Sequence, residues 1–161
     1  MSQSPIGHTV FTTANDASAV HSPGELVEVL DSTGLKRYQY VKYSNGTDNT
    51  VLAANEPVGY ALTDQTTVLR DLSDTVANLI AGVALNAISD GYYGWIQTWG
   101  AGSVLMNNDD DAAVGMSIIW GADGTCDTVA AGTASTYRPL GICNVAVVAA
   151  TNVAGVVLNL L

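Results

Sequence analysis

Three stretches of the sequence begin alike, with a glycine near the start of a short apolar run. They are Val58–Leu62, Ala81–Leu85 and, more loosely, Leu140–Cys143. In the second and third copies a polar turn, Ser89–Gly91 or Thr151–Asn152, leads into a further apolar run. Units of strand, turn and strand are typical of β-hairpins. Because the spacing between copies is irregular, the pattern predicts one all-β domain, an antiparallel sandwich or barrel built from hairpins, rather than a solenoid.

Turn-forming residues divide the rest of the chain into further short strands. The other predicted strands are Leu26–Leu30, Lys36–Tyr43, Thr50–Ala54, Pro57–Leu62, Ser103–Met106, Val114–Trp120, Asn144–Ala150 and Val153–Leu160. Along the second of these, alternation predicts that Tyr38 and Tyr40 share one face while Val41 and Tyr43 share the other.

Two segments are less regular. Apolar residues recur at helical spacing in Leu69–Asn78, which predicts at most one short helix, although Thr67–Arg70 also suits a strand. Thr125–Thr136 is rich in Ala, Gly and Thr, and is predicted to be a loop or a loose edge.

With 161 residues, the chain is long enough for one domain with a real core. The first 19 residues, Met1 to Ala19, are small and polar around the β-branched patch Thr9–Thr13. This segment is predicted to be a first strand or an extended arm that orders on a partner. Residues 20–161 are predicted to form a single β domain.

The chain is 48% hydrophobic but only 12% charged, a pattern that suits a protein living in contact with something else. Its 15 acidic and 5 basic residues give a net charge of −10, with Lys36 and Arg37 the main basic cluster. Because nucleic-acid binding depends on clustered cations, neither nucleic acid nor an anionic membrane is a predicted partner. The long uncharged C-terminal run and the low charge density predict a homo-oligomer, most simply a trimer.

The uncharged run Leu140–Leu161 is long enough to cross a bilayer. It contains Asn144, Asn152 and Asn159, however, and polar side chains are costly in lipid. Two buried strands are therefore predicted in its place. Since no basic residue precedes Lys36, the N-terminus lacks the charged start of a secretory signal.

No motif supports catalysis, a cofactor or a metal, so no residue is assigned to any of these roles. The two histidines, His8 and His21, lie outside any nucleophile signature. The glutamates Glu25, Glu28 and Glu56 form no recognisable pair of catalytic carboxylates. The acidic stretch Asn107–Asp111 is the strongest candidate for a cation, but it fails the EF-hand pattern and is predicted to be a solvated turn.

The two cysteines, Cys126 and Cys143, make no metal-type pair. They are predicted to be reduced thiols in or near a core, with a disulfide between them left open. The aromatic residues Tyr92, Tyr93, Trp95 and Trp99 are predicted to stack on a sugar ring or to pack in a core or subunit interface.

The run Gly82–Gly100, with Tyr93-Gly94-Trp95-Ile96-Gln97 at its centre, resembles a stretch in small structural proteins of tailed bacteriophages. Tyr137–Gly141, followed by a polar turn and a closing apolar strand, resembles the same group, so that the likeness covers the half of the chain after Leu79. It implies a capsid decoration (cement) protein, made in the host cytoplasm, that binds the outside of the assembled head where major capsid protein subunits meet. Such proteins are commonly β-rich and trimeric, and have no active site.

Two other functions remain open. A carbohydrate-binding module of a phage tail fibre or spike would use Tyr93, Trp95 and Trp99 as its platform, and a small hydrolase ranks below both. Exposure of Trp95 distinguishes the first two functions, because a platform for a sugar must be open to solvent.

Overall fold

The computed structural model describes residues 14–44, 50–61, 64–70, 75–107, 112–121, 124–129, 138–148 and 151–160. All regular structure within these ranges is β, which confirms the predicted all-β class. The strands are β1 Leu26–Asp31, β2 Gly34–Ser44, β3 Pro57–Ala61, β4 Asp64–Leu69, β5 Thr75–Ala84, β6 Tyr93–Leu105, β7 Ser117–Trp120, β8 Cys126–Val129, β9 Gly141–Val148 and β10 Val153–Asn159. The glycines of the three repeats, Gly59, Gly82 and Gly141, lie in β3, β5 and β9, as predicted.

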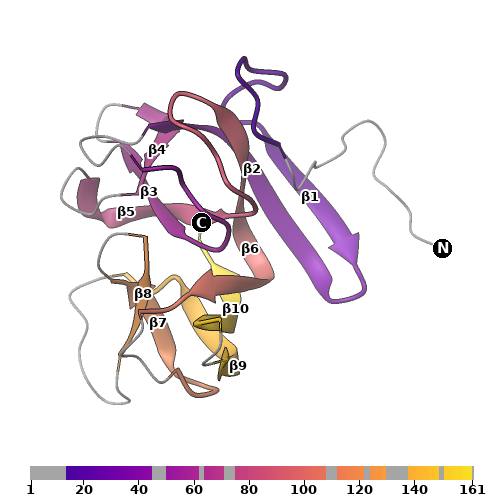
Figure 1. The fold of residues 1–161 in the computed structure, drawn as a ribbon. Helices are drawn as coiled ribbons and strands as arrows, with labels where there is room; N and C mark the ends of the chain where they lie inside the picture. The colour runs from indigo at the N-terminus through magenta and orange to yellow at the C-terminus, as the bar shows by residue number, and fades with distance from the viewer. Residues whose placement is uncertain are drawn as a thin grey trace.

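The first half of the chain closes a ring of strands (Figure 1). β2, β4, β3, β5 and β6 pair in that order, and β6 pairs back onto β2. The β2–β4 pair is parallel, whereas the other four pairs of the ring are antiparallel. The core of this ring consists of Val41, Tyr43, Leu52, Val58, Val68, Ala81, Ala84, Ile88 and Ile96.

The second half of the chain forms a second group of strands on the other end of β6. β6 pairs with β10, and the sheet continues through β9 and β7 to β8. A bridge between Met106, just after β6, and Cys126 in β8 brings the last strand back toward β6. The large side chains of this second core include Ile118, Trp120, Leu140, Val156 and Leu158.

β6 is a single strand of 13 residues that serves both groups, so the predicted break before Ser103 is wrong. The strand bends instead at Gly100, whose φ is +88° and where a Cβ would lie 2.3 Å from the Leu35 carbonyl oxygen. The buried Gln97 side chain stabilises this bend, because its Nε2 donates hydrogen bonds to the carbonyls of Trp99 and Ala101 at 3.0 and 2.9 Å. Only glycine allows so close a crossing in this conformation.

A tight contact joins the two groups of strands. Trp120 in β7 is 1% exposed, and its ring lies directly over Gly59 in β3. A Cβ at Gly59 would lie 2.3 Å from Cζ3 of that ring. The two groups are thus packed together through β3 and β7 as well as through β6.

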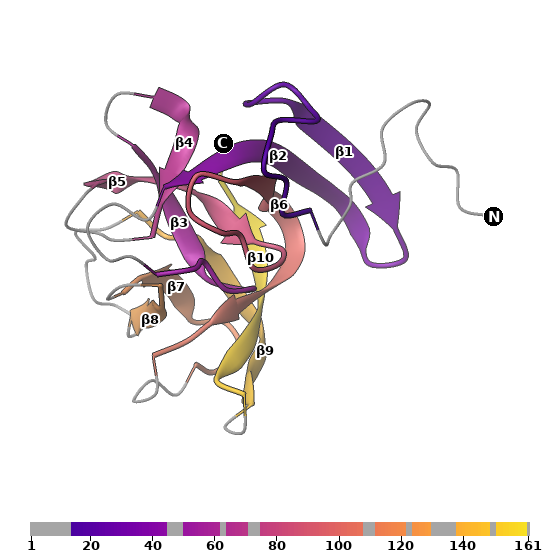
Figure 2. The ribbon, with the colours of Figure 1, turned by 45° about the horizontal axis from the view of Figure 1, so that its top comes forward.

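The β1–β2 hairpin extends beside the first ring (Figures 1 and 2), and Thr33 in its turn lines a hollow together with residues of β6, β9 and β10. In the described residues β1 pairs only with β2. One face of the hairpin carries Val27, Tyr38 and Tyr40, which pack with Ala14 and Trp95 in a third core. As predicted, Tyr38 and Tyr40 share this face, while Val41 and Tyr43 lie in the first ring on the other.

The structure decides between the alternatives left open for two segments and corrects a third. In Leu69–Asn78 the described residues take the strand alternative, because Leu69 ends β4 and Thr75–Asn78 belong to β5, whose partners across the sheet outweigh local helical spacing. For Thr125–Thr136, predicted to be a loop or a loose edge, the described part contains the edge strand β8, which agrees with the second alternative. The strand predicted from Val114 begins only at Ser117, since Val114 lies in a turn and is 66% exposed.

Candidate interaction surfaces

The predicted aromatic platform is not open to solvent. Trp95 is fully buried, and its ring packs 5.1 Å from the rings of both Tyr40 and His21. Of the other predicted members, Tyr93 stacks on Tyr40 at 6.0 Å and is half-buried, while Tyr92 is exposed. Trp95 and Tyr93 therefore pack in a core rather than present a flat surface to a sugar, while Trp99, further along β6, is half-buried.

Residues 14–25, here called the strap, cover this aromatic core. The Tyr40 hydroxyl donates a 2.6 Å hydrogen bond to Asp16 Oδ2, and the amide of Asp16 donates a 2.9 Å bond to the Tyr93 carbonyl. Asn86 Nδ2 donates a bond to the Ala14 carbonyl at 2.9 Å. Ala14 is buried, so the strap is integral to the domain from that residue onward. The patch Thr9–Thr13 lies outside the described residues.

The environment raises the pKa of several tyrosines. Burial, followed by the hydrogen bond to Asp16, raises the pKa of Tyr40 above its usual 10.0. Burial also raises the pKa of Tyr38 and of Tyr60. The folded protein therefore holds these phenol protons more tightly than the unfolded chain does.

The predicted candidates for acid–base chemistry lie apart. His21 Nδ1 is 3.6 Å from Glu25 Oε2, Glu28 pairs with Arg37 at 2.7 Å, and Glu56 pairs with Arg70 at 3.2 Å. His8 lies outside the described residues, as do residues 108–111 of the acidic stretch. Within the described ranges, no three His, Cys, Asp or Glu side chains gather in a way that could hold a metal ion. Glu28 and Glu56 form separate ion pairs and Glu25 lies beside His21, so the three glutamates do not meet in one site.

The buried ion pair between Glu56 and Arg70 connects separate elements of the fold. Glu56 is 5% exposed, and its Oε2 accepts hydrogen bonds from the Ala53 amide at 2.9 Å and from Arg70 Nε at 3.2 Å. A Cβ at Gly124, in the turn before β8, would lie 2.5 Å from Arg70 Nε. The pair thus links the start of β3, the end of β4 and the second group of strands.

The two cysteines are free and buried, as predicted. Cys126 and Cys143 both belong to the core of the second group of strands. Burial raises the pKa of each thiol, most strongly for Cys126, so both stay protonated near neutral pH.

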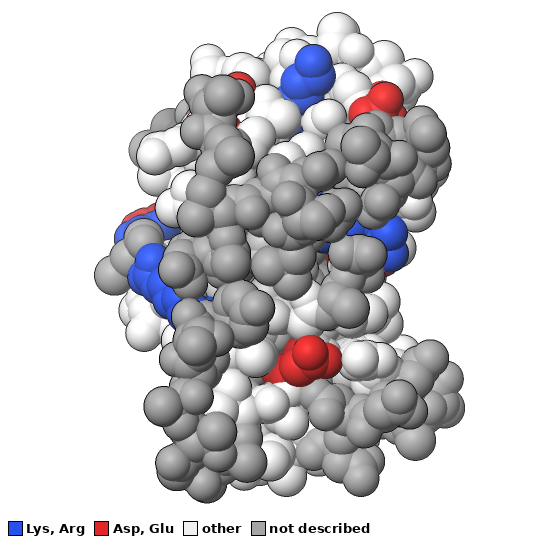
Figure 3. Space-filling view, turned by 90° about the vertical axis from the view of Figure 1, so that its left-hand side faces the viewer, with Lys and Arg blue, Asp and Glu red and all other residues white. Residues whose placement is uncertain are grey.

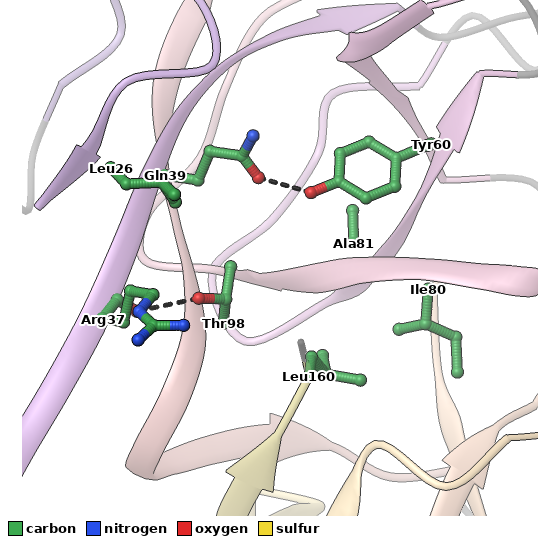
Figure 4. Close-up of a pocket in the computed structure, with 8 residues that line it drawn as sticks. All are labelled: Leu26, Arg37, Gln39, Tyr60, Ile80, Ala81, Thr98 and Leu160. Atoms are coloured by element: carbon green, nitrogen blue, oxygen red, sulfur yellow. Dashed lines mark hydrogen bonds between the residues drawn. The ribbon is translucent and has the colours of Figure 1, made fainter.

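A small cleft lies between the hairpin and the first ring (Figure 4). Leu26, Arg37 and Gln39 of the hairpin line one side, and the Tyr60 hydroxyl donates a hydrogen bond to Gln39 Oε1 across it. Its volume is about 150 Å³. Because ligand pockets usually enclose about 300–1,000 Å³, this cleft is too small to hold a substrate of ordinary size.

The same face of the hairpin exposes three leucines that sequence reasoning missed. Leu26 is 59% exposed, Leu30 is 67% exposed, and Leu35, opposite Leu30 in the register, is 46% exposed. We call these three side chains the leucine ridge. One sequence signal could have indicated this exposure. Val27 and Val29 alternate with leucines, so both faces of β1 carry apolar side chains, and a strand at the edge of a domain buries only one of its two faces.

A shallow groove runs along the outer face of the second group of strands. Ala101 and Ser103 of β6, Val153 and Gly155 of β10, and Val145 of β9 line it. Next to it on the same face, Ile142 and Val157 pair across β9 and β10 and are 47% and 45% exposed. We call this surface the sheet groove. Thr33 and Lys36 from the hairpin tip form its rim.

Charged side chains form no large patch of one sign on the face drawn in Figure 3, so far as its residues are described. Lys36, at the rim of the sheet groove, pairs with Asp31 at 2.9 Å. No helix in the described part of the chain is long and apolar enough to cross a membrane.

Comparison with known proteins shows that this chain resembles a solved structure in its fold. No protein-family model matches the chain, and no curated protein matches its sequence. Among solved structures, the chain is similar to the head fibre gp8.5 N base of bacteriophage phi29, with a TM-score of 0.52 and 14% sequence identity. The match covers 84% of this chain and 95% of that chain. This chain therefore shares its β architecture with the base of a bacteriophage head fibre.

Proposed function

We propose that this protein is a structural protein of a tailed-phage virion that binds the outside of the assembled head and stabilises contacts between major capsid protein subunits. The observation that carries the proposal is the likeness of fold to a phage head fibre base along most of both chains. The resemblance of Gly82–Gly100 to small phage structural proteins, a separate line of reasoning, points to the same class of protein.

The chemistry of the described residues agrees with a role in binding rather than catalysis. The candidate acids pair separately with bases, and the cleft is small. A protein of net charge −10 is repelled by packaged nucleic acid and is suited to the outer side of the shell. A partner that binds only the assembled shell stabilises that state by mass action.

The burial of Trp95 argues against the alternative function as a carbohydrate-binding module. That function requires an exposed aromatic platform, whereas Trp95 is fully buried beneath the strap. A second structural role, as the base of a head fibre, is favoured by the phi29 neighbour. Both structural roles involve the head surface, but only the cement role requires the head itself to become more resistant.

We further propose that the protein acts as a homotrimer and that its first residues contribute to attachment. Several weak contacts made together by an oligomer give strong binding even when each segment must order on its partner. Deleting residues 1–13 preserves the strap, because the buried Ala14 and its contact with Asn86 remain. The truncated chain is therefore expected to fold normally and to bind heads much more weakly.

The experiment is co-sedimentation of full-length and truncated protein with undecorated heads, with thermal unfolding of both chains as the control for folding. Full-length protein that stays in the supernatant contradicts the proposed attachment to heads. Equal binding of the truncated chain contradicts only the role of the first residues. Heating decorated and bare heads then separates the two structural roles, since a cement protein raises the temperature at which heads release DNA and a fibre base does not.

A further inference from the structure

We infer that the free edge of β1 binds the head by accepting an extended segment of the major capsid protein as the next strand of the sheet. The inference rests on the proposed function, because it takes the major capsid protein as the partner. In the described residues β1 pairs on one side only, with β2, although it is six residues long. Figures 1 and 2 show it as the outermost strand of the hairpin.

Alternate residues of β1 direct their backbone groups away from the domain. In an antiparallel pair, every second residue bonds to the partner strand, and the residues between them point their N–H and C=O groups outward. The Tyr40 amide donates a 2.9 Å hydrogen bond to the Glu25 carbonyl, and the register then continues without a shift along β1. By this alternation Val27 and Val29 bond to β2. The residues whose backbone groups face the free edge are Leu26, Glu28 and Leu30.

The strand at the other end of the sheet, β8, is not open in the same way. Met106 forms a bridge with Cys126 of β8, and the Asn107 amide donates a 2.9 Å hydrogen bond to the Cys126 carbonyl. By contrast, β1 has neither a proline nor a shift of register, two of the features that commonly protect an edge strand. An unprotected edge of this kind is a template for the addition of a strand, because its backbone groups bond to any extended chain that fits.

The side chains along this edge select the sequence of the added strand. Its alternate side chains would lie beside the leucine ridge, whose exposed fractions run from 46% to 67%. Asp31, at the end of β1, pairs with Lys36 at 2.9 Å. Glu28, in the middle of the edge, pairs with Arg37 at 2.7 Å, but half of its side chain stays exposed. The expected partner is therefore an extended segment with apolar residues beside the leucines and a neutral or basic residue opposite Glu28.

The position of Glu28 disfavours a second copy of this chain at the same edge. If two β1 strands paired antiparallel over their full length through their outward residues, the Glu28 side chains of the two copies would lie directly opposite each other. Like charges at opposite positions are destabilising, and the net charge of −10 on each copy adds to the repulsion. A segment of the capsid protein avoids this conflict. Because a shell repeats that segment, an oligomer can bind it at several edges together.

Amide hydrogen exchange tests the edge in the wild-type protein, free and bound to undecorated heads. The amides of Leu26, Glu28 and Leu30 are expected to exchange quickly in the free protein and at least about tenfold more slowly on heads. The amides of Val27 and Val29 are the internal reference, because their bonds to β2 protect them in both states. Wild-type protein that sediments with heads while its outward amides stay unprotected overturns this inference and leaves the proposed function standing.

Two substitutions at Glu28 separate the backbone donor from the side chain. Glu28→Pro removes the outward N–H and places a ring where the added strand would lie, whereas the bonds to β2 come from the neighbouring residues and remain. Glu28→Gln also removes the carboxylate but keeps the N–H. In co-sedimentation with undecorated heads, Glu28→Pro is expected to bind at least about tenfold more weakly than Glu28→Gln. Equal binding of the two variants overturns the inference.

Circular dichroism and thermal unfolding establish whether Glu28→Pro keeps the fold. If it does not, Leu30→Pro and Leu30→Ala repeat the comparison at the next outward residue, and amide exchange in the wild-type protein decides in either case. Outward amides that are already protected in the free protein also overturn the inference, because another copy or the chain's own residues then cover the edge. Wild-type protein that does not sediment with heads overturns the proposed function, and this inference with it.

Discussion

Replacing Gly59 by alanine tests whether the two groups of strands form one packed unit. The new Cβ would lie 2.3 Å from Cζ3 and 2.6 Å from Cη2 of Trp120, far inside contact distance. Because Trp120 is 1% exposed, its ring cannot swing into solvent. Overpacking of this kind costs about 1–3 kcal/mol, and the lower entropy of the unfolded chain with alanine offsets about 0.4–1 kcal/mol of it. We expect a net loss of about 1–2 kcal/mol in the free energy of unfolding.

The companion variant, Trp120→Phe, removes the atoms that the new methyl group meets. Alone it leaves a cavity and costs about 2–4 kcal/mol. In the double variant the methyl group enters that space, so the combined loss should fall short of the sum of the two single losses by more than about 1 kcal/mol. Urea unfolding of all four proteins measures this coupling. Additivity to within about 0.5 kcal/mol would refute the described contact between β3 and β7.

Three further outcomes follow from the described contacts. Tyr40→Phe removes the hydrogen bond to the partly exposed Asp16 and should cost about 1–2 kcal/mol in urea unfolding, whereas Tyr92→Phe at an exposed position should cost almost nothing. Arg70→Met leaves the buried Glu56 carboxylate without this cation and should cost about 2–4 kcal/mol, most of which a second change, Glu56→Gln, should recover. Because the fold raises the pKa of buried phenols from 10.0, their contribution to stability is complete below pH 10 and is lost as pH rises further, which thermal unfolding across an alkaline series measures.

The β1–β2 and β9–β10 hairpins could be predicted because the residues that form their turns lie between the paired strands in the sequence. The turn before β10 contains Asn152, whose φ is +51°, and β2 begins directly after its turn at Gly34, whose φ is +120°. Glycine and asparagine tolerate a positive φ, so they mark turns whatever the tertiary packing around them. The two hairpins β1–β2 and β9–β10 were found for this reason, with ends that differ by only a few residues.

The errors arose where distant partners decide the structure. The spacing of apolar residues around Leu69 and Val76 fits a helix locally, yet both residues lie in strands, β4 and β5, that pair with β3. The sequence predicts a separate strand from Ser103, but β6 runs on through Gly100, where it bends as it crosses Leu35. Leu35 is distant from Gly100 in sequence, and β4 and β5 lie on opposite sides of β3, so local spacing alone indicates neither outcome.

The candidate surfaces were harder to predict than the fold. Alternation placed Trp95 on a definite face of its strand, but it could not reveal that the strap covers that face. In the same way, the sequence around Leu30 does not reveal that the hairpin leaves the domain and exposes its leucines. Exposure depends on which segments pack over a strand, and that information is spread along the whole chain.

The strand that both groups share also governs how the chain can fold. β6 must reach β2 across a long loop, since Thr98 donates a hydrogen bond to the Arg37 carbonyl 61 residues earlier. Contacts this far apart in sequence give a high contact order, and domains of that kind fold in about milliseconds to seconds rather than microseconds. During synthesis the first ring can close once Gln97, the partner of Tyr38, has left the ribosome, whereas the second group waits for β10. The edge of β6 that later pairs with β10 is consequently unpaired for the time needed to make about half as many residues again, and an unpaired strand edge in a partly folded chain is prone to aggregation.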